Sequence, residues 1–106
     1  MRRKINPKAL YSISRSMDID ELMLWIKKVG RRLIVMKTIN QNDVIKASEI
    51  ATKTGRSLQN ISYAIRELEK YELIRCITPE KSTWKRFIFT EKGIKVFEKL
   101  RKSDID

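Results

Sequence analysis

At 106 residues, with 42% apolar residues, three glycines and two prolines, the sequence is typical of one folded domain with one modest core rather than of a low-complexity chain. Its 24 basic residues outnumber 13 acidic residues and give a net charge of +11, which suits nucleic acid or an anionic membrane surface, with general solubility as the alternative. The absence of histidine and the single cysteine exclude a histidine-dependent catalytic triad, a disulfide framework and an ordinary zinc site, so neither metal nor cofactor is expected.

The first 40 residues have the signals of helices. A proline directly after an asparagine predicts a short helix over residues 7–14. Asp18 with Glu21 three residues later predicts a capped helix start. Gly30 interrupts the pattern that follows, so one long helix over 18–39 and two helices meeting near Gly30 both remain open. The helical spacing is set by Leu22, Ile26, Val29, Leu33 and Met36.

A short extended segment, 44–47, is followed by two helices joined by a tight turn. Ser48 is the predicted N-cap of a helix over 49–54, and Gly55 suits the left-handed residue that ends it. Ser57 is the predicted cap of a second helix, over about 57–71. The apolar residues of this second helix recur at steps of three and four and are Ile61, Ala64, Ile65 and Leu68. This is the sequence form of a helix-turn-helix.

From residue 73 the apolar period changes to about two, which predicts a β-hairpin of strands 73–77 and 84–89. Residues 73–90 carry four bases and one acid, and residues 1–17 carry five bases and no acid, so the excess positive charge gathers in these two segments. Thr90 is the predicted cap of a last helix over 91–102. Cys76 lies in the apolar run of the first strand and is expected to be a small sheet or core residue rather than a redox sensor.

The ordered set of these motifs resembles the winged helix-turn-helix regulators of the ArsR and MarR type found in prokaryotes. The resemblance covers roughly residues 30–101 and rests on the runs Ser48–Ala51, Thr54–Ser57, Ile61–Glu69, Leu73–Ile74 and Phe89–Gly93. It implies a mainly helical fold with a small β-hairpin, a winged helix-turn-helix with an extra N-terminal helix. We expect one domain over 1–106, with an arm and helix at 1–29 and the winged helix-turn-helix core at 30–102.

The sequence departs from this family at two places. The family usually has glycine where this chain has Glu72, so the turn after the second helix must be made differently. The cysteine and histidine ligands of metal-sensing members are absent, so metal sensing is not implied.

The resemblance implies that the helix at about 57–71 enters the major groove of DNA and that the wing at 75–89 lies on the backbone or in the minor groove. Successive rotations of 100° place Gln59, Tyr63, Arg66 and Lys70 opposite Ile61, and Asn60 and Ser62 flank that face near the helix start. An ordinary solvated helix face is the alternative. Trp84, in the wing, either packs on the domain or stacks on DNA. The expected DNA-contacting residues are Ser57, Gln59, Asn60, Ser62, Tyr63, Arg66, Lys70, Lys81, Lys85 and Arg86.

The apolar residues of the 18–39 segment exceed what a three-helix winged core requires. We therefore expect a homodimer whose interface includes Leu22, Trp25, Ile26 and Val29. The alternative is an extra helix packed on its own domain.

Together these features predict a sequence-specific double-stranded DNA-binding protein that regulates transcription. The alternatives are a winged-helix protein-interaction module and a sequence-independent architectural nucleic-acid binder. No stretch approaches the roughly 20 apolar residues needed to span a bilayer, and no secretory signal follows the basic N-terminus, so a cytoplasmic protein is expected. With no histidine and no glycine-rich phosphate loop, the chain is not expected to be an enzyme.

Overall fold

The computed structural model describes residues 17–42, 44–78, 80 and 85–104. Within them it places five helices and one three-stranded sheet, so the expected fold class is confirmed. The helix expected over 7–14 lies outside the described residues. The elements are α2 (Ile19–Lys27), α3 (Gly30–Asn42), β2 (Ile45–Lys46), α4 (Ala47–Thr54), α5 (Leu58–Lys70), β3 (Ile74–Cys76), β4 (Arg86–Phe89) and α6 (Glu91–Asp104).

The 18–39 segment forms two helices, which meet just before Gly30. α2 starts with the predicted capping box: Asp18 Oδ1 accepts a bond from the Glu21 backbone N–H at 2.8 Å, and Glu21 Oε1 accepts one from the Asp18 N–H at 3.0 Å. α2 ends at Lys27 and α3 begins at Gly30. The glycine that interrupts the helical pattern is thus the first residue of a new helix.

The caps of α4 and α5 are set by local hydrogen bonds. α4 begins at Ala47 with Lys46 as N-cap, so the prediction of Ser48 as N-cap is wrong. The reason is that β2 ends at Lys46, whose N–H is satisfied by Glu49 Oε1 at 3.0 Å. Gly55 ends α4 in the left-handed region at φ 74°, and Ser57 Oγ caps α5 by accepting from the Asn60 N–H at 3.0 Å, both as predicted.

Glu72 makes the turn between α5 and β3. It takes the left-handed backbone itself, at φ 61°, in place of the glycine that the resembled family uses. The Leu73 N–H donates to the Leu68 carbonyl at 3.0 Å and the Glu72 N–H to the Glu69 carbonyl at 2.9 Å, which together form a Schellman motif. The helix therefore ends as a glycine-capped helix would, with a side chain in a strained position.

The predicted hairpin is present, and its second strand is the centre of the sheet. The strand order is β2-β4-β3, with both pairings antiparallel. Phe87 of β4 lies opposite Ile45 on one side and Cys76 on the other. Thr90 caps α6 as predicted, its Oγ1 accepting from the Gly93 N–H at 3.0 Å.

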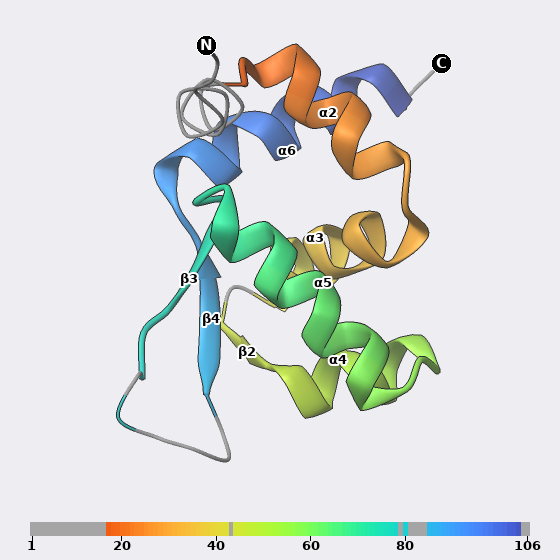
Figure 1. Ribbon diagram of the computed structural model, residues 1–106, viewed down its shortest axis with the longest axis vertical. Helices are drawn as coiled ribbons and strands as arrows, with labels where there is room; N and C mark the ends of the chain where they lie inside the picture. Colours follow the sequence, from red (N-terminus) through yellow and green to blue (C-terminus); the bar gives the residue numbers. More distant parts are fainter. Residues whose placement is uncertain (1–16, 43, 79, 81–84, 105–106) are drawn as a thin grey trace, which may run out of the picture.

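Figure 1 shows α2 and α6 together at one end of the molecule, with α4 and the hairpin toward the opposite end and α3 and α5 between them. All four apolar residues predicted to face inward on α5 are buried. No helix among the described residues is long and apolar enough to cross a membrane. The fully buried large side chains are Leu22, Ile26, Val35, Met36, Ile39, Ile45, Ile50, Ile61, Leu68, Leu73, Ile74 and Leu100.

Candidate nucleic-acid interface

The solvent face of α5 carries the polar residues expected there. Gln59, Tyr63, Arg66 and Lys70 are all exposed, on the side of the helix away from the buried Ile61. The guanidinium carbon of Arg66 lies 5.7 Å from the centroid of the Tyr63 ring, a cation–π distance. The helix thus presents an amide, an aromatic ring and two cations along one exposed face.

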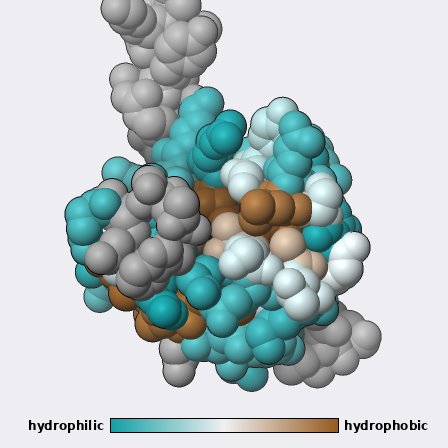
Figure 2. Space-filling view, turned by 90° about the horizontal axis from the view of Figure 1, so that it is seen from below, coloured by the Kyte–Doolittle hydropathy of each residue, from teal (hydrophilic) through white to brown (hydrophobic). Residues whose placement is uncertain are grey.

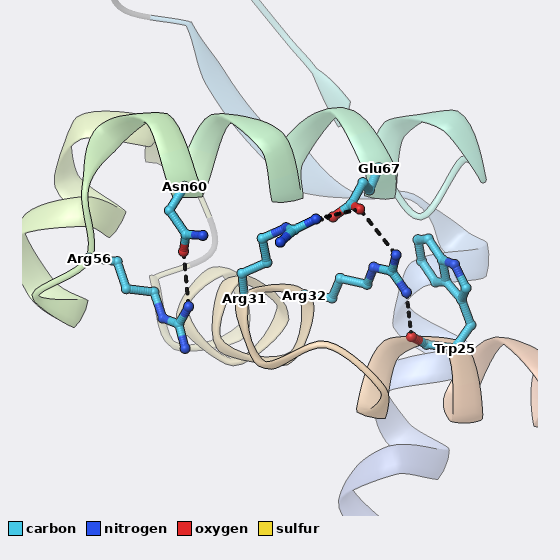
Figure 3. A network of polar contacts seen from close by, with 6 residues as sticks. All are labelled: Trp25, Arg31, Arg32, Arg56, Asn60 and Glu67. Carbon is cyan, nitrogen blue, oxygen red and sulfur yellow. Dashed lines mark hydrogen bonds and ion pairs between the residues drawn. The ribbon is translucent and has the colours of Figure 1, made fainter.

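The start of α5 is organised by a cap and by one arginine. Ser57 is exposed, but its hydroxyl already caps the helix. Asn60 is half-buried, and its Oδ1 accepts a hydrogen bond from Arg56 Nη1 at 2.9 Å (Figure 3). Sequence reasoning did not single out Arg56; its position in the turn, four residues before Asn60, was the available signal.

Lys85 and Arg86 are the described cations at the start of the second strand of the hairpin. Lys85 is exposed, and Arg86 is half-buried opposite Lys46 in the sheet register. The Arg86 backbone N–H donates to Thr78 Oγ1 at 2.9 Å, which joins the two strands at the end of the hairpin next to the connecting loop. Lys81 and Trp84 lie outside the described residues.

A groove of about 410 Å³ lies between α5, the start of α4 and β4, and we call it the wing groove. Leu58, Ile65 and Phe87 supply apolar surface, and Ser62 and Arg66 are among its polar lining residues. Figure 2 looks at the molecule from the end of α4 and the hairpin, and shows apolar surface near the middle of this face with hydrophilic surface around it.

The wing groove has an excess of positive charge. Lys46, Arg66 and Lys85 line it together with a single carboxylate, that of Glu69. Burial raises the pKa of Glu69, and the charge of Lys85 partly offsets this effect. The electrostatics of the groove therefore favour a negatively charged partner.

On its opposite flank, α5 is tied to α3 by a network around Glu67 (Figure 3). The Arg31 guanidinium binds both carboxylate oxygens, at 3.0 and 2.9 Å, and Arg32 Nη2 binds one of them at 3.1 Å. Burial favours a raised pKa for Glu67, but the hydrogen bonds and charges of the two arginines outweigh it and lower the pKa. A carboxylate in this setting is held ionised and paired.

Arg32 extends the network to α2. Its Nη1 donates to the Trp25 carbonyl at 2.8 Å, and its guanidinium carbon lies 4.0 Å from the Trp25 ring centroid. Trp25 in turn meets the Tyr71 ring edge-on, with centroids 4.6 Å apart. Sequence reasoning missed these partners of Glu67, because neither arginine is near Glu67 in the sequence.

Comparison with known proteins agrees with this geometry. Residues 31–75, which include α4 and α5, match the family model described as winged helix-turn-helix DNA-binding. The chain has a winged helix-turn-helix fold. The resemblance inferred from the sequence is therefore confirmed. No curated protein matches the sequence.

Solved structures share this fold at low sequence identity. A MarR-family transcription regulator superposes with a TM-score of 0.66 at 17% identity, covering 93% of this chain and 72% of its own. A mutant of MepR from S. aureus, bound to an oligodeoxyribonucleotide, has a TM-score of 0.66 at 17% identity, with 93% and 76% covered. The homodimeric winged helix-turn-helix domain of a possible ArsR-family regulator from Mycobacterium bovis superposes with a TM-score of 0.62 at 20% identity, covering 99% of this chain and 88% of its own.

The winged-helix core uses part of the apolar surface that the sequence interpretation assigned to a dimer interface. Leu22 and Ile26 are 0% exposed and belong to the protomer's own core, because α2 packs against α3 and α6. The expectation that these residues are surplus to the core is wrong. Trp25 and Val29 are half-buried, and the exposed apolar side chain of α2 is Leu24, at 67%.

Metal ligands do not cluster in the described part of the winged helix. No group of three or more cysteine, aspartate or glutamate side chains there is placed to hold an ion. Cys76 is a half-buried thiol in β3 whose sulfur lies 4.0 Å from Thr78 Oγ1. It packs against the core, as predicted.

Proposed function

We propose that this winged-helix protein binds double-stranded DNA with sequence specificity and regulates transcription. The observation that carries the proposal is the exposed face of α5, with Gln59, Tyr63, Arg66 and Lys70, beside a groove of positive charge excess. The description of the matching family model and the oligodeoxyribonucleotide bound to one structural neighbour support it.

In the proposed complex α5 is the recognition helix and lies in the major groove. The amide of Gln59 suits an adenine edge, and the guanidinium of Arg66 suits guanine or a phosphate. Lys85 and Arg86 of the wing are proposed to bind phosphates, which position the protein without reading sequence. Asn60 is proposed to contact DNA in the orientation that its hydrogen bond with Arg56 gives it. Ser57 and Ser62 are proposed to contact DNA at the rim of the same face.

We also propose that the protein acts as a homodimer. One structural neighbour is described as a homodimeric domain, and Leu24 on α2 leaves a large apolar side chain 67% exposed at the end of the molecule away from the hairpin. A two-fold axis near that end sets two recognition helices about 34 Å apart, one turn of DNA. Since chromosomal DNA in prokaryotes lies in the cytoplasm, the proposal includes a cytoplasmic location.

The decisive experiment is selection of bound sequences from random duplexes, followed by affinity measurements on the selected site over a range of salt concentrations. We expect one enriched site, and a logarithm of affinity that falls linearly with the logarithm of salt by about 0.9 per neutralised phosphate. Equal affinity for unrelated duplexes would favour an architectural nucleic-acid binder. No binding at low salt would favour a protein-interaction module, and either result would contradict the proposal.

A further inference from the structure

The first residue of the recognition helix is a leucine that the protein leaves in water. Leu58 is 52% exposed, although it lies beside the buried Ile61 and Ile65 on the same helix. A single exposed leucine is ordinary on a protein surface. The position of Leu58 is unusual for an exposed leucine, because the N-terminal residues of a recognition helix are those that approach base edges.

Leu58 belongs to the wing groove and continues its apolar surface. Ile65 and Phe87, both buried, lie in the same groove, so Leu58 extends a strip of apolar surface toward solvent. Polar residues surround this strip, with Ser48 on α4 and Ser62 on α5 lining the groove beside it. The apolar strip therefore lies inside a polar rim rather than on an isolated hydrophobic face.

The charge of that rim determines which partner meets the apolar strip. Lys46, Arg66 and Lys85 line the groove and outnumber its one carboxylate, Glu69. A polyanion attracted by these cations must present whatever apolar group it has to Leu58. In the major groove of DNA that group is the 5-methyl of thymine, which distinguishes a T·A pair from the others by apolar contact.

We propose that Leu58 is a specificity-determining residue that reads the 5-methyl group of a thymine through apolar contact. This rests on the proposed DNA binding and adds a reader of a different kind to the polar side chains of α5. Contact of the methyl with Leu58 removes both from water, and the loss of one buried methyl group corresponds to about a fourfold change in affinity.

The test uses the duplex selected for the wild-type protein, with each thymine replaced in turn by deoxyuridine, which lacks only the methyl group. For the wild type we expect one or two positions at which this replacement weakens binding by about fourfold. In Leu58→Ala the same replacements should change affinity less than twofold, with the thymine duplex itself bound more weakly. Ile94→Ala, at another exposed apolar residue that lies on α6 and does not line the groove, is the matched control and should keep the full deoxyuridine effect.

The outcomes separate this inference from the function on which it rests. A preferred duplex whose deoxyuridine variants all bind like the parent would overturn the role of Leu58 and leave DNA recognition intact. An equal methyl effect in the wild type and in Leu58→Ala would also overturn it, since another residue would then be the reader. The absence of any preferred duplex would overturn the proposed function and this inference with it. Circular dichroism of both variants verifies that the exposed substitutions leave the fold unchanged.

Discussion

Glu67 of the recognition helix accepts two parallel hydrogen bonds from Arg31 of α3, at 3.0 and 2.9 Å. This fork-to-fork arrangement is geometrically specific, because both partners are planar and must align. Arg32, bound to the same carboxylate, reaches α2 through the Trp25 carbonyl. The orientation of the recognition helix is thus fixed by charge as well as by the apolar core beneath it.

Replacing Glu67 with Gln should destabilise the fold. The amide keeps the size of the side chain but removes the charge that pairs two arginines, one of which has a buried Nε with no partner. We expect a loss of about 1.5–3 kcal/mol in the free energy of unfolding at neutral pH, measured by urea denaturation. Glu98→Gln, at an exposed position on α6, is the control and should change the free energy of unfolding by less than about 0.5 kcal/mol.

The pairing of Glu67 with Arg31 and Arg32 also predicts that the stability of the fold depends on pH. Because the pKa of Glu67 is lower in the folded protein than in the unfolded chain, its contribution is present above the unfolded value of about 4.3 and is lost as pH falls through the folded value. The stability difference between wild type and Glu67→Gln should therefore narrow progressively in acid. A difference that stays constant from pH 7 to pH 3 would contradict an ionised, paired Glu67.

Gly93 is expected to tolerate no side chain. A Cβ at this position would lie 1.9 Å from the Leu73 carbonyl oxygen, a backbone atom that also accepts the Thr90 N–H. Gly93→Ala should cost at least about 3 kcal/mol or prevent folding, because α6 must move off the sheet. Gly30→Ala is the matched control: its Cβ would meet only the end of the flexible Arg56 side chain, at 3.2 Å, and the melting temperature should hardly change.

Glu72 offers the opposite case, a position where glycine should help. Its left-handed backbone, φ 61°, costs a residue with a Cβ about 1–2 kcal/mol, of which glycine regains part after its own entropic penalty. Glu72→Gly is expected to raise the free energy of unfolding by up to about 1 kcal/mol. Glu72→Ala removes the charge but keeps the Cβ, so an equal gain in both variants would assign the effect to charge instead.

Local signals predicted most of this fold, and their failures have physical causes. The caps at Asp18, Ser57 and Thr90 were predictable because each involves residues three apart in the sequence. Ser48 was assigned wrongly because strand pairing of β2 with β4, a long-range contact, decides where α4 begins. Its competitor, Lys46, has no side-chain feature that marks it as a cap.

The sequence predicted the exposed face of the candidate site but not its long-range contacts or the groove beside it. Helical periodicity placed Gln59, Tyr63, Arg66 and Lys70 on one exposed face without knowledge of the tertiary structure. The pairing of Arg31 with Glu67 spans 36 residues, and the wing groove combines residues of β2, α4, α5 and β4. Such features depend on how the elements pack, which periodicity does not specify.

The wing and the recognition helix should contribute differently to DNA binding. Lys85→Ala removes a groove cation and leaves Glu69 less compensated, so all duplexes should bind more weakly and the salt slope should fall by about one unit. Gln59→Ala should instead relax preference at particular base pairs, by about 1–3 kcal/mol if the amide contact is bidentate. Lys95→Ala on α6, exposed but distant from the groove, is the control for charge alone. Altered preference in Lys85→Ala with unaltered preference in Gln59→Ala would reverse these roles.

The last prediction concerns two neighbouring apolar residues of α2 that the structure places in opposite environments. Ile26 is 0% exposed in the protomer core, whereas Leu24 is 67% exposed. Ile26→Glu buries an unpaired charge and should unfold the chain whatever its oligomeric state. Leu24→Glu places its charge in water in the monomer, so a monomeric fold should survive it.

If the protein is a homodimer through this face of α2, Leu24→Glu brings like charges together across the two-fold axis and should yield folded monomers. These monomers should bind a palindromic duplex at least tenfold more weakly than the wild type, because only one recognition helix engages each site. Sedimentation equilibrium of wild type, Leu24→Glu and Leu24→Ala measures the assembly, and circular dichroism verifies the fold. A wild type that is monomeric at micromolar concentration would refute the dimer. A Leu24→Glu variant that remains dimeric would place the interface on another surface of the molecule.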